Sequence, residues 1–168
     1  MRHTMKEIKK IELANLPTKI EKLCGTSARY GKNVFIKRDD QSGSEFSGNK
    51  IRKLEYAIAE AKETGCDTLI TCGGIQSNHC RATAAAAVKL GLRCIVLLAS
   101  ETDNPTPDGN LLLDRLLGAE IRFISPDEYA ANRGTVMESM VKELAAKGQK
   151  GYIIPMGASN GIGAFGYF

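Results

Sequence analysis

Thr68-Leu69-Ile70-Thr71-Cys72-Gly73-Gly74-Ile75-Gln76-Ser77-Asn78-His79 is the stretch that decides the predicted fold. Residues 68–72 form a compact, largely apolar run bounded by turn residues, which predicts a strand that is buried on both faces. Two glycines then mark a loop, and the polar residues at 77–79 open an alanine-rich segment that Gly91 ends. Because polar residues and glycine commonly delimit helices in this way, residues 78–90 are predicted to form a helix.

The same pattern repeats through the rest of the chain. Further strands are predicted at 94–98, 121–124 and 152–155, with helices at 110–117 and 126–147 between them. Strands that alternate with helices form parallel sheets with right-handed crossovers. The sequence therefore predicts an α/β fold, in which an open parallel sheet carries helices on both faces in three layers.

The region before the first of these strands is less regular. A helix is expected from about Asn49 to Gly65, and a short β-rich run at 34–37 precedes a Ser- and Gly-rich loop at 41–48. Residues 1–33 carry no clear periodicity apart from a turn at 15–18. We therefore divide the chain into a leading segment at 1–48, a small α/β domain at 49–155, and the start of a second half at 156–168.

Composition and charge exclude several classes of protein. The chain has 168 residues, 43% of them hydrophobic and 25% charged, as in ordinary globular domains. The net charge is +4, and no basic run is long or interleaved with aromatic residues, so nucleic-acid binding is not expected. No stretch approaches the ~18 consecutive apolar residues of a membrane span. The first residues lack the apolar core of a secretory signal.

The five cysteines predict free thiols. Their number is odd and no C-x-x-C pair is present, so we expect buried, reduced side chains in a cytoplasmic protein. His3 and His79 are the only histidines, which gives no ligand spacing for zinc and predicts no metal site.

Two places in the sequence are candidates for chemistry. The first is the loop from Gly73 to His79, since ligands in open parallel sheets bind beyond the carboxyl ends of the strands. Its glycines allow a ligand close to the backbone, and the helix that Ser77, Asn78 and His79 open has free N–H groups for a carboxylate or phosphate. The alternative is that Ser77 or Asn78 only caps the helix.

The second candidate is Lys50, in the first turn of its predicted helix. A positive charge opposes the dipole there, and Arg52 and Lys53 add two more cations. These surroundings favour a neutral amine that can form a Schiff base. The alternative is an ordinary solvated lysine.

The end of the chain, 161–166, formally matches the dinucleotide pattern G-x-G-x-x-G. The helix and the acidic residue that would support the match fall beyond Phe168, so the pattern stands alone and nicotinamide binding is only a weak option. We interpret these glycines as tight packing of a helix against the sheet.

Four stretches together resemble one enzyme family. They are Phe35-Ile36-Lys37-Arg38-Asp39-Asp40, Gly48-Asn49-Lys50-Ile51-Arg52-Lys53-Leu54-Glu55, Gln76-Ser77-Asn78-His79 and Ile154-Pro155-Met156-Gly157-Ala158-Ser159-Asn160. Their combination is similar to the D-cysteine desulfhydrase and 1-aminocyclopropane-1-carboxylate deaminase family of pyridoxal-phosphate enzymes, which have the tryptophan synthase β-like fold. The resemblance extends over nearly the whole chain from Val34.

The resemblance implies roles for individual residues. Lys50 would bind pyridoxal 5'-phosphate as a Schiff base and then move protons, and Asn78 would hydrogen-bond the ring hydroxyl of the cofactor. Asn49 would contact the cofactor or orient Lys50. Ser77, with the backbone amides of Asn78 and His79, would bind the carboxylate of a small amino-acid substrate. Residues 1–48 would belong to the larger cofactor domain.

The resemblance also implies an activity. D-cysteine would be converted to pyruvate, ammonia and hydrogen sulfide by α,β-elimination, and 76–79 together with 108–111 favour this reaction over the ring-opening deaminase alternative. In family members the glycine-rich phosphate cradle, the partner of the pyridine nitrogen and the substrate tyrosines lie in a C-terminal half beyond Phe168. We expect a homodimer at full length and a truncated, inactive chain here. A non-catalytic remnant domain remains the alternative of another class.

Overall fold

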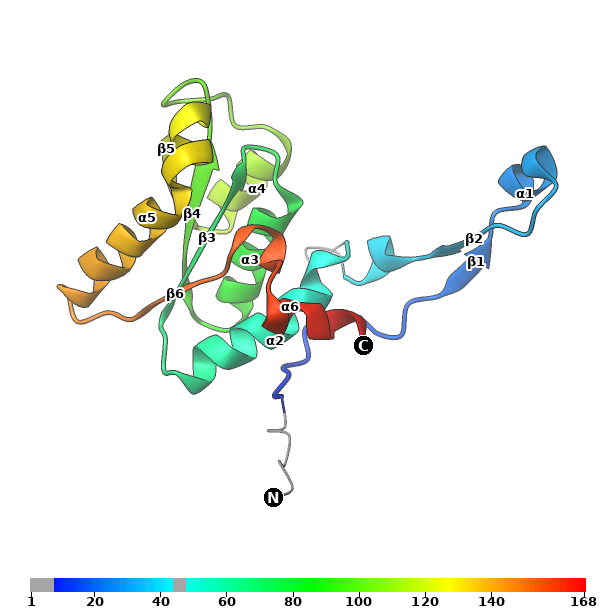
Figure 1. Ribbon diagram of the computed structural model, residues 1–168, viewed down its shortest axis with the longest axis horizontal. Coiled ribbons are helices and arrows are strands. Elements are labelled where there is room, and N and C mark those ends of the chain that lie inside the picture. Colours follow the sequence, from blue (N-terminus) through cyan, green and yellow to red (C-terminus); the bar gives the residue numbers. More distant parts are fainter. Residues whose placement is uncertain (1–7, 44–47) are drawn as a thin grey trace, which may run out of the picture.

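The body of the protein is a four-stranded parallel sheet (Figure 1). The computed structural model describes residues 8–43 and 48–168. The strands lie in the order β5-β4-β3-β6. Their bounds are β3 Thr68–Gly74, β4 Arg93–Ala99, β5 Glu120–Ile124 and β6 Gly151–Ile153. The predicted alternation of strands and helices and the parallel sheet are therefore confirmed.

Helices cover both faces of this sheet. Helices α2 (Lys50–Glu63), α3 (Asn78–Lys89) and α4 (Gly109–Leu116) lie on one side, and α5 (Pro126–Ala145) lies on the other (Figure 1). The core is accordingly split into two clusters of buried side chains. One joins α2 and α3 to Leu69, Val96 and Leu98, and the other joins α5 to alternate residues of the same strands. The three-layer prediction is confirmed.

Local sequence chemistry explains several boundaries of these elements. The Ser125 hydroxyl accepts a hydrogen bond from the Glu128 N–H at 3.2 Å and caps α5, as predicted. The alanine run of α3 is buried, so this helix can pack close to the sheet. The predicted strand 152–155 is shorter, ending at Ile153. Ile154 N–H still donates to the Ile70 carbonyl at 2.8 Å, but Pro155 has no N–H to continue the pairing.

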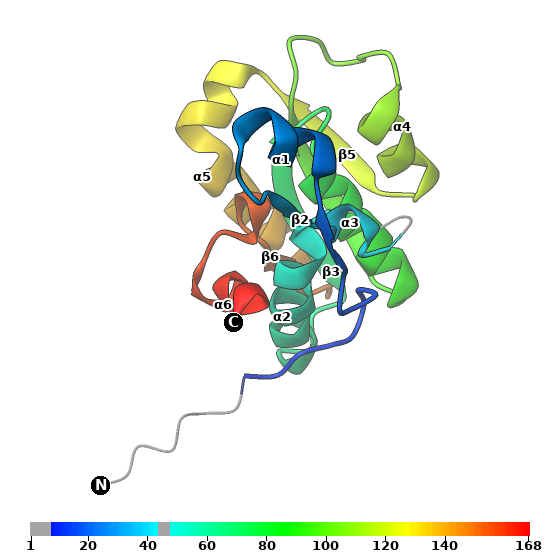
Figure 2. The same cartoon turned by 90° about the vertical axis from the view of Figure 1, so that its right-hand side faces the viewer.

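The leading segment forms an arm that projects from the body (Figures 1 and 2). Strand β1 (Ile20–Lys22) pairs antiparallel with β2 (Phe35–Lys37), and α1 (Cys24–Tyr30) connects them. The strand predicted at 34–37 therefore exists but lies outside the main sheet. The other two elements were not predicted, because neither a strand of three residues nor a helix of seven shows a clear periodicity.

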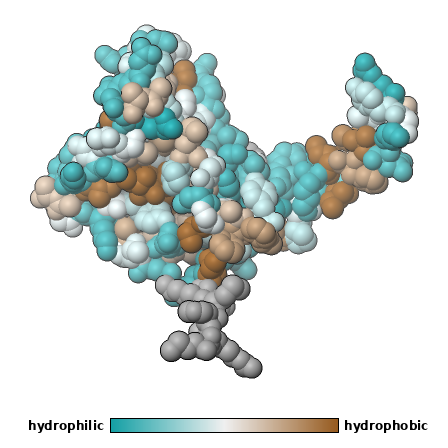
Figure 3. Space-filling view, in the orientation of Figure 1, coloured by the Kyte–Doolittle hydropathy of each residue, from teal (hydrophilic) through white to brown (hydrophobic). Residues whose placement is uncertain are grey.

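Apolar side chains are exposed along this arm, where the surface is brown in Figure 3; they include Ile20, Leu23, Phe35 and Ile36. Part of the predicted boundary loop, 44–47, lies outside the described residues. The division of the chain into domains stays a prediction.

The polypeptide before the arm is attached to α2 by a buried carboxylate. Glu55 is 1% exposed, and its Oε1 accepts the N–H groups of Leu13 and Ala14, each at 2.8 Å. The ammonium of Lys10 lies 3.2 Å from the other carboxylate oxygen. Two hydrogen bonds and one ion pair thus offset the desolvation of this carboxylate.

The end of the chain packs on α2. It consists of η2 (Met156–Ala158), α6 (Gly161–Ala164) and η3 (Phe165–Tyr167). A Cβ on Gly166 would lie 2.5 Å from the Arg52 carbonyl oxygen, and one on Gly163 would lie 2.0 Å from that of Ala158. The glycines therefore permit close packing, but the expectation of contact with the sheet is wrong, because their partners are helix α2 and the turn after β6.

Among the described residues, no helix is long and apolar enough to cross a membrane. All five cysteines are free, and four of them are buried, whereas Cys24 on the arm is exposed. The expectation of buried thiols therefore fails at Cys24. In the same part of the chain, no three or more His, Cys, Asp and Glu side chains are grouped to hold a metal ion.

Asp114 on α4 is a buried carboxyl that faces α3. It is 0% exposed, and neither carboxylate oxygen has a hydrogen-bond partner in the described part of the chain. Burial raises the pKa of this carboxyl to about 7, and the charge of Arg81 partly opposes the rise. The thiols of Cys80 and Cys94 also lie near it. Asp114 is therefore protonated in mildly acidic solution and charged in mildly alkaline solution.

We predict that the stability of Asp114→Asn, compared with that of the wild type at the same pH, is more favourable at pH 8 than at pH 5. The folded pKa of Asp114 lies above its unfolded value near 3.8, so its favourable protonated state is lost as pH rises through about 7. The amide cannot ionise and removes this loss, which we expect to be on the order of 2 kcal/mol. Urea unfolding of both proteins at the two pH values measures the difference. Equal differences between variant and wild type at both pH values would contradict the prediction.

Candidate active site

The candidate site lies where the direction of strand addition reverses. From β3 the chain crosses through α3 to β4 on one side, whereas β6 pairs with β3 on the other side. Such a switch point leaves a crevice at the carboxyl ends of the strands, where ligands of open parallel sheets bind. The segment after β3 and the segment after β6 both begin at this edge. The start of α2 lies next to both segments.

The turn from β3 into α3 is closely packed. A Cβ on Gly73 would lie 2.6 Å from both the Cβ and the Oγ of Ser77, so only glycine fits without displacing the serine. Ser77 N–H donates to the Gly74 carbonyl at 3.0 Å, and Ser77 Oγ accepts from Cys80 N–H at 3.2 Å. Ser77 is therefore the N-cap of α3. Its hydroxyl proton is not used in the cap, so capping and ligand binding are compatible roles.

The next two residues place their side chains differently. Asn78 is exposed, and its Nδ2 is 3.6 Å from the position of a Cβ on Gly48, close to the start of α2. His79 is 2% exposed, with Nε2 2.9 Å from the Thr71 hydroxyl, which itself donates to the Ile154 carbonyl at 2.9 Å. Since that hydroxyl proton is already used, His79 Nε2 donates and Thr71 accepts.

The imidazole of His79 is neutral at physiological pH. Burial, together with the charges of Lys50 and Lys53, lowers its pKa to about 4. Its side chain thus fixes the start of α3 to β3 and the end of β6. A ligand at the N-terminus of α3 can therefore contact only the backbone N–H of His79. This N–H and that of Asn78 lie in the first turn of the helix, before its internal hydrogen bonds begin.

Lys50 is the first residue of α2 and is partly buried. Its Nζ donates to Asn49 Oδ1 at 2.9 Å, and its Cε lies 3.7 Å from the position of a Cβ on Gly157. Gly157 and Ala158 have φ angles of 65° and 47°, and such a conformation is strained for alanine. The turn after β6 therefore supports the aliphatic part of the lysine.

One helical turn further on, Lys53 holds the same turn. Its Nζ donates to the Gly157 carbonyl and to the Ser159 hydroxyl, each at 3.0 Å. Burial lowers the pKa of the Lys53 amine, and the nearby charge of Lys50 adds to the effect. The two amines thus make this edge of the sheet attractive to an anion.

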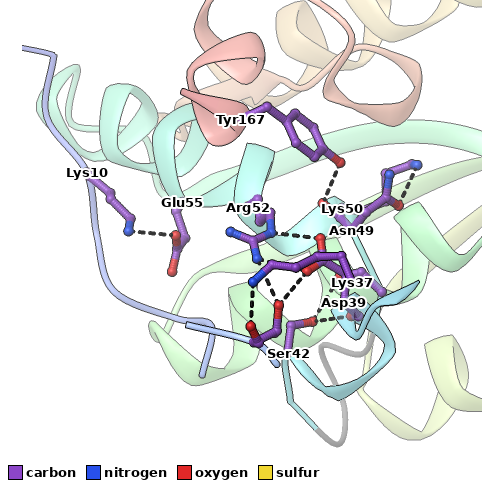
Figure 4. A network of polar contacts seen from close by, with 11 residues as sticks. Lys10, Lys37, Asp39, Ser42, Asn49, Lys50, Arg52, Glu55 and Tyr167 are labelled. Atoms are coloured by element: carbon purple, nitrogen blue, oxygen red, sulfur yellow. Dashed lines mark hydrogen bonds and ion pairs between the residues drawn. The ribbon is translucent and has the colours of Figure 1, made fainter. Parts of the chain in front are cut away.

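Asp39 holds the segment that precedes Lys50 and leads into α2 (Figure 4). Arg52 grips its carboxylate with two N–H···O bonds of 2.8 Å, and the hydroxyl of Thr18 donates to it at 2.8 Å. The Arg52 guanidinium accordingly keeps the pKa of this carboxyl below its usual range. The Asp39 carbonyl accepts Gly48 N–H at 2.9 Å, so the residue joins the arm to the turn before α2.

The structure brings together all five residues that the sequence singled out. Asn49 and Lys50 lie at the start of α2, and Ser77, Asn78 and His79 lie at the start of α3, beside the same edge of the sheet. Sequence reasoning missed the support that Lys53 and Asp39 provide. Both positions lie within the stretches that carry the family resemblance, but nothing in the sequence pairs residue 53 with 157 or residue 39 with 52.

The chain belongs to the family described as "Pyridoxal-phosphate dependent enzyme", whose model matches residues 11–168. The bifunctional D-cysteine desulfhydrase/1-aminocyclopropane-1-carboxylate deaminase, mitochondrial, of Arabidopsis thaliana is 45% identical over 160 residues, or 92% of this chain and 40% of that protein. D-cysteine desulfhydrase of Klebsiella pneumoniae (strain 342) is 41% identical over 162 residues, or 94% of this chain and 48% of that protein.

Two solved structures are similar. A structure described as an ACC deaminase homologue superposes with a TM-score of 0.86 at 40% identity, covering 94% of this chain and 47% of that one. A fungal L-serine ammonia-lyase from Rhizomucor miehei shares the fold, with a TM-score of 0.62 at 16% identity. The predicted family and its pyridoxal phosphate dependence are confirmed. This chain spans less than half the length of each of these relatives.

The residues present fit part of a pyridoxal phosphate site. The cofactor carries an aldehyde and a phosphate, and the site offers a partly buried primary amine at Lys50 with a second amine at Lys53. The amide groups of Asn49 and Asn78 add neutral hydrogen-bonding groups on either side. This donor set suits an anionic aldehyde better than a metal ion.

We predict that Gly73→Ala destabilises the protein by roughly 1–3 kcal/mol, because the new methyl group overlaps Ser77. Gly74→Ala is the matched control, since a Cβ at Gly74 meets nothing within 4 Å and should change stability by at most about 0.5 kcal/mol. Urea unfolding of the two variants measures both values. Equal effects at the two neighbouring glycines would show that the close contact at Ser77 is absent.

Proposed function

We propose that this chain provides the lysine-bearing and carboxylate-binding part of a pyridoxal-phosphate-dependent lyase that acts on D-cysteine. One observation carries the proposal: the partly buried amine of Lys50 lies near the start of α3, close enough for its charge to lower the pKa of His79, and the first amides of this helix precede its internal hydrogen bonds. An amino acid has the groups that such a site binds, a carboxylate for the helix and an α-carbon held near the amine.

Each residue has a distinct task in this proposal. Lys50 holds the cofactor through its Nζ and, once the substrate has replaced it, carries a proton between the α-carbon and the leaving group. Asn49, which accepts from that Nζ at 2.9 Å, orients the amine. Asn78 hydrogen-bonds the ring hydroxyl of the cofactor. Ser77 Oγ–H and the N–H groups of Asn78 and His79 bind the substrate carboxylate.

The reaction follows from this arrangement. When bound, the cofactor supplies an electron sink for the negative charge that remains at the α-carbon after its proton departs. Lys50 Nζ accepts that proton, and the thiol leaves from the β-carbon. D-cysteine and water thus give pyruvate, ammonia and hydrogen sulfide. The neutral His79 imidazole stays out of the proton transfers, because it is buried and hydrogen-bonded to Thr71.

The runner-up is the ring-opening 1-aminocyclopropane-1-carboxylate deaminase. It requires the same carboxylate site and the same lysine, and the relative from Arabidopsis thaliana is named for both reactions. Residues 76–79 and 108–111 resemble the desulfhydrase side, and the relative from Klebsiella pneumoniae is named for that reaction alone. The alternative to an enzymatic function is that the chain is a non-catalytic remnant domain.

Other features of the whole protein are also proposals. We place residues 1–48 with a larger cofactor domain, because the arm exposes apolar side chains away from the sheet, and 49–155 as the small domain. We further propose a homodimer at full length and a location in the cytoplasm, where the free thiols would stay reduced. By itself, the 168-residue chain should bind the cofactor poorly and show little or no activity.

Borohydride trapping tests the role of Lys50. At saturating pyridoxal phosphate, reduction should attach the cofactor to the peptide that contains Lys50 at least about fivefold more than to other lysine peptides, as expected for an amine that the site holds beside the bound aldehyde. Peptide mass spectrometry measures the label. Lys50→Ala should lose the preference, whereas Lys62→Ala, at the exposed other end of α2, should keep it. Labelling spread evenly over the lysines would favour the remnant alternative.

Product analysis separates the two reactions. In a form of the protein that includes the second half found in the relatives, D-cysteine should release sulfide at least about tenfold faster than 1-aminocyclopropane-1-carboxylate yields ketobutyrate, a difference of about 1.4 kcal/mol in transition-state stabilisation. The two kcat/KM values measure this ratio. A reversed ratio would assign the protein to the deaminases.

A further inference from the structure

The side chain of Gln76 is bound to the start of α4. Its Nε2 donates to Asp108 Oδ1 at 2.6 Å and to the Asp108 carbonyl at 3.3 Å. Its Oε1 accepts the N–H of Asn110 at 2.9 Å. Both ends of the amide are therefore engaged within the protein, although Gln76 is exposed and precedes the serine of the proposed carboxylate site.

Helix α4 also donates a hydrogen bond back to residue 76. Asn110 Nδ2 donates to the backbone carbonyl of Gln76 at 2.9 Å, so each residue binds both a side-chain and a backbone group of the opposing segment. Gly109 lies between the two partners at φ 47°, and a Cβ there would stand 2.5 Å from Gln76 Oε1. The close approach thus requires glycine at 109. We call these four hydrogen bonds the 76–110 clamp.

The clamp acts on the backbone that presents the ligand groups. The Gln76 carbonyl belongs to the peptide unit whose N–H is that of Ser77, and this N–H donates to the Gly74 carbonyl at 3.0 Å. Fixing this peptide unit therefore fixes the direction of the Ser77 side chain and of the amides that follow. Helix α4 in turn is packed on α3 through buried Leu111 and Asp114.

We propose that Gln76 and Asn110 are positioning residues that hold the Ser77–His79 turn in its anion-binding conformation. The inference rests on the proposed function for the nature of the ligand, a carboxylate, but not for the clamp itself. Without the clamp the turn would sample other conformations, and apparent affinity falls in proportion to the competent fraction. Asn110, at the start of α4, thereby affects binding without touching the ligand.

Hydrogen exchange of the ¹⁵N-labelled 168-residue chain tests the clamp without any ligand. Gln76→Ala and Asn110→Ala should each speed exchange of the Ser77 and Cys80 amides at least about tenfold, while the amides of β3 and β4 stay unchanged. The double variant should go little further than either single one, because both remove the same interaction. Gln149→Ala and Asn132→Ala are matched controls, since neither side chain makes a hydrogen bond within residues 8–43 and 48–168, and should leave these amides unaffected.

Titration with inorganic sulfate tests the consequence for anion binding. The amide shifts of Asn78 and His79 report the site, and the sulfate Kd should rise at least about fivefold in Gln76→Ala, Asn110→Ala and the double variant alike. Asp108→Asn keeps acceptor oxygens for Gln76 Nε2 and should stay within about twofold of the wild type. A change in overall stability alone would not produce this pattern.

Hydrogen exchange and sulfate titration contradict different claims when they fail. Unchanged exchange at Ser77 and Cys80 in both single variants, or additive effects in the double variant, would overturn the positioning role. Amide shifts of Asn78 and His79 that do not respond to sulfate in the wild type would instead contradict the anion site of the proposed function, and exchange would still decide the clamp. Loss of sulfate binding in Gln76→Ala but not in Asn110→Ala would mean that Gln76 binds the anion directly, which also overturns the proposal.

Discussion

Strand β3 pairs with a parallel neighbour on each side, and the rest of the structure depends on this double pairing. Because β3 and β6 are adjacent and parallel, the segments that follow them begin side by side at one edge of the sheet. The glycine contact at Ser77 then starts α3 directly at that edge. Every group assigned to ligand binding lies there because of this arrangement.

The charges at this edge of the sheet are predominantly positive. Two lysine amines on α2 face the turn after β6, while the nearby histidine is kept neutral by burial and by these same charges. The Asp39–Arg52 pair is satisfied internally, since each charge has its partner and Thr18 completes the set. Beside the turn after β6, in the described part of the chain, the amines of Lys50 and Lys53 have no carboxylate partner, which agrees with an anionic cofactor and with the proposed amino-acid substrate.

The apolar runs and helical periodicity of the chain from residue 49 onward were sufficient to predict the helices and strands of the body, because most of them are long enough to show a pattern and are bounded by glycine, proline or a capping residue; β6 has only three residues but belongs to a short apolar run that ends at Pro155. Of the arm, only β2 was expected, as the β-rich run at 34–37, whereas β1, with three residues, and α1, with seven, were missed because neither shows a clear pattern. The five site residues came from a family resemblance, which physical reasoning supported at Lys50 and Ser77. The resemblance did not separate ligand-binding residues from supporting ones such as Asp39.

By itself, then, the sequence determined the alternation of buried strands and helices, the helix start at Ser77 and the amine at Lys50, because these depend on neighbours along the chain. The tertiary structure alone decided which strand β6 joins, that the His79 imidazole turns inward, and that Gln76 is tied to Asn110. Those outcomes depend on contacts between residues that are distant in sequence. Local propensity and spacing carry no information about which of many polar groups will meet.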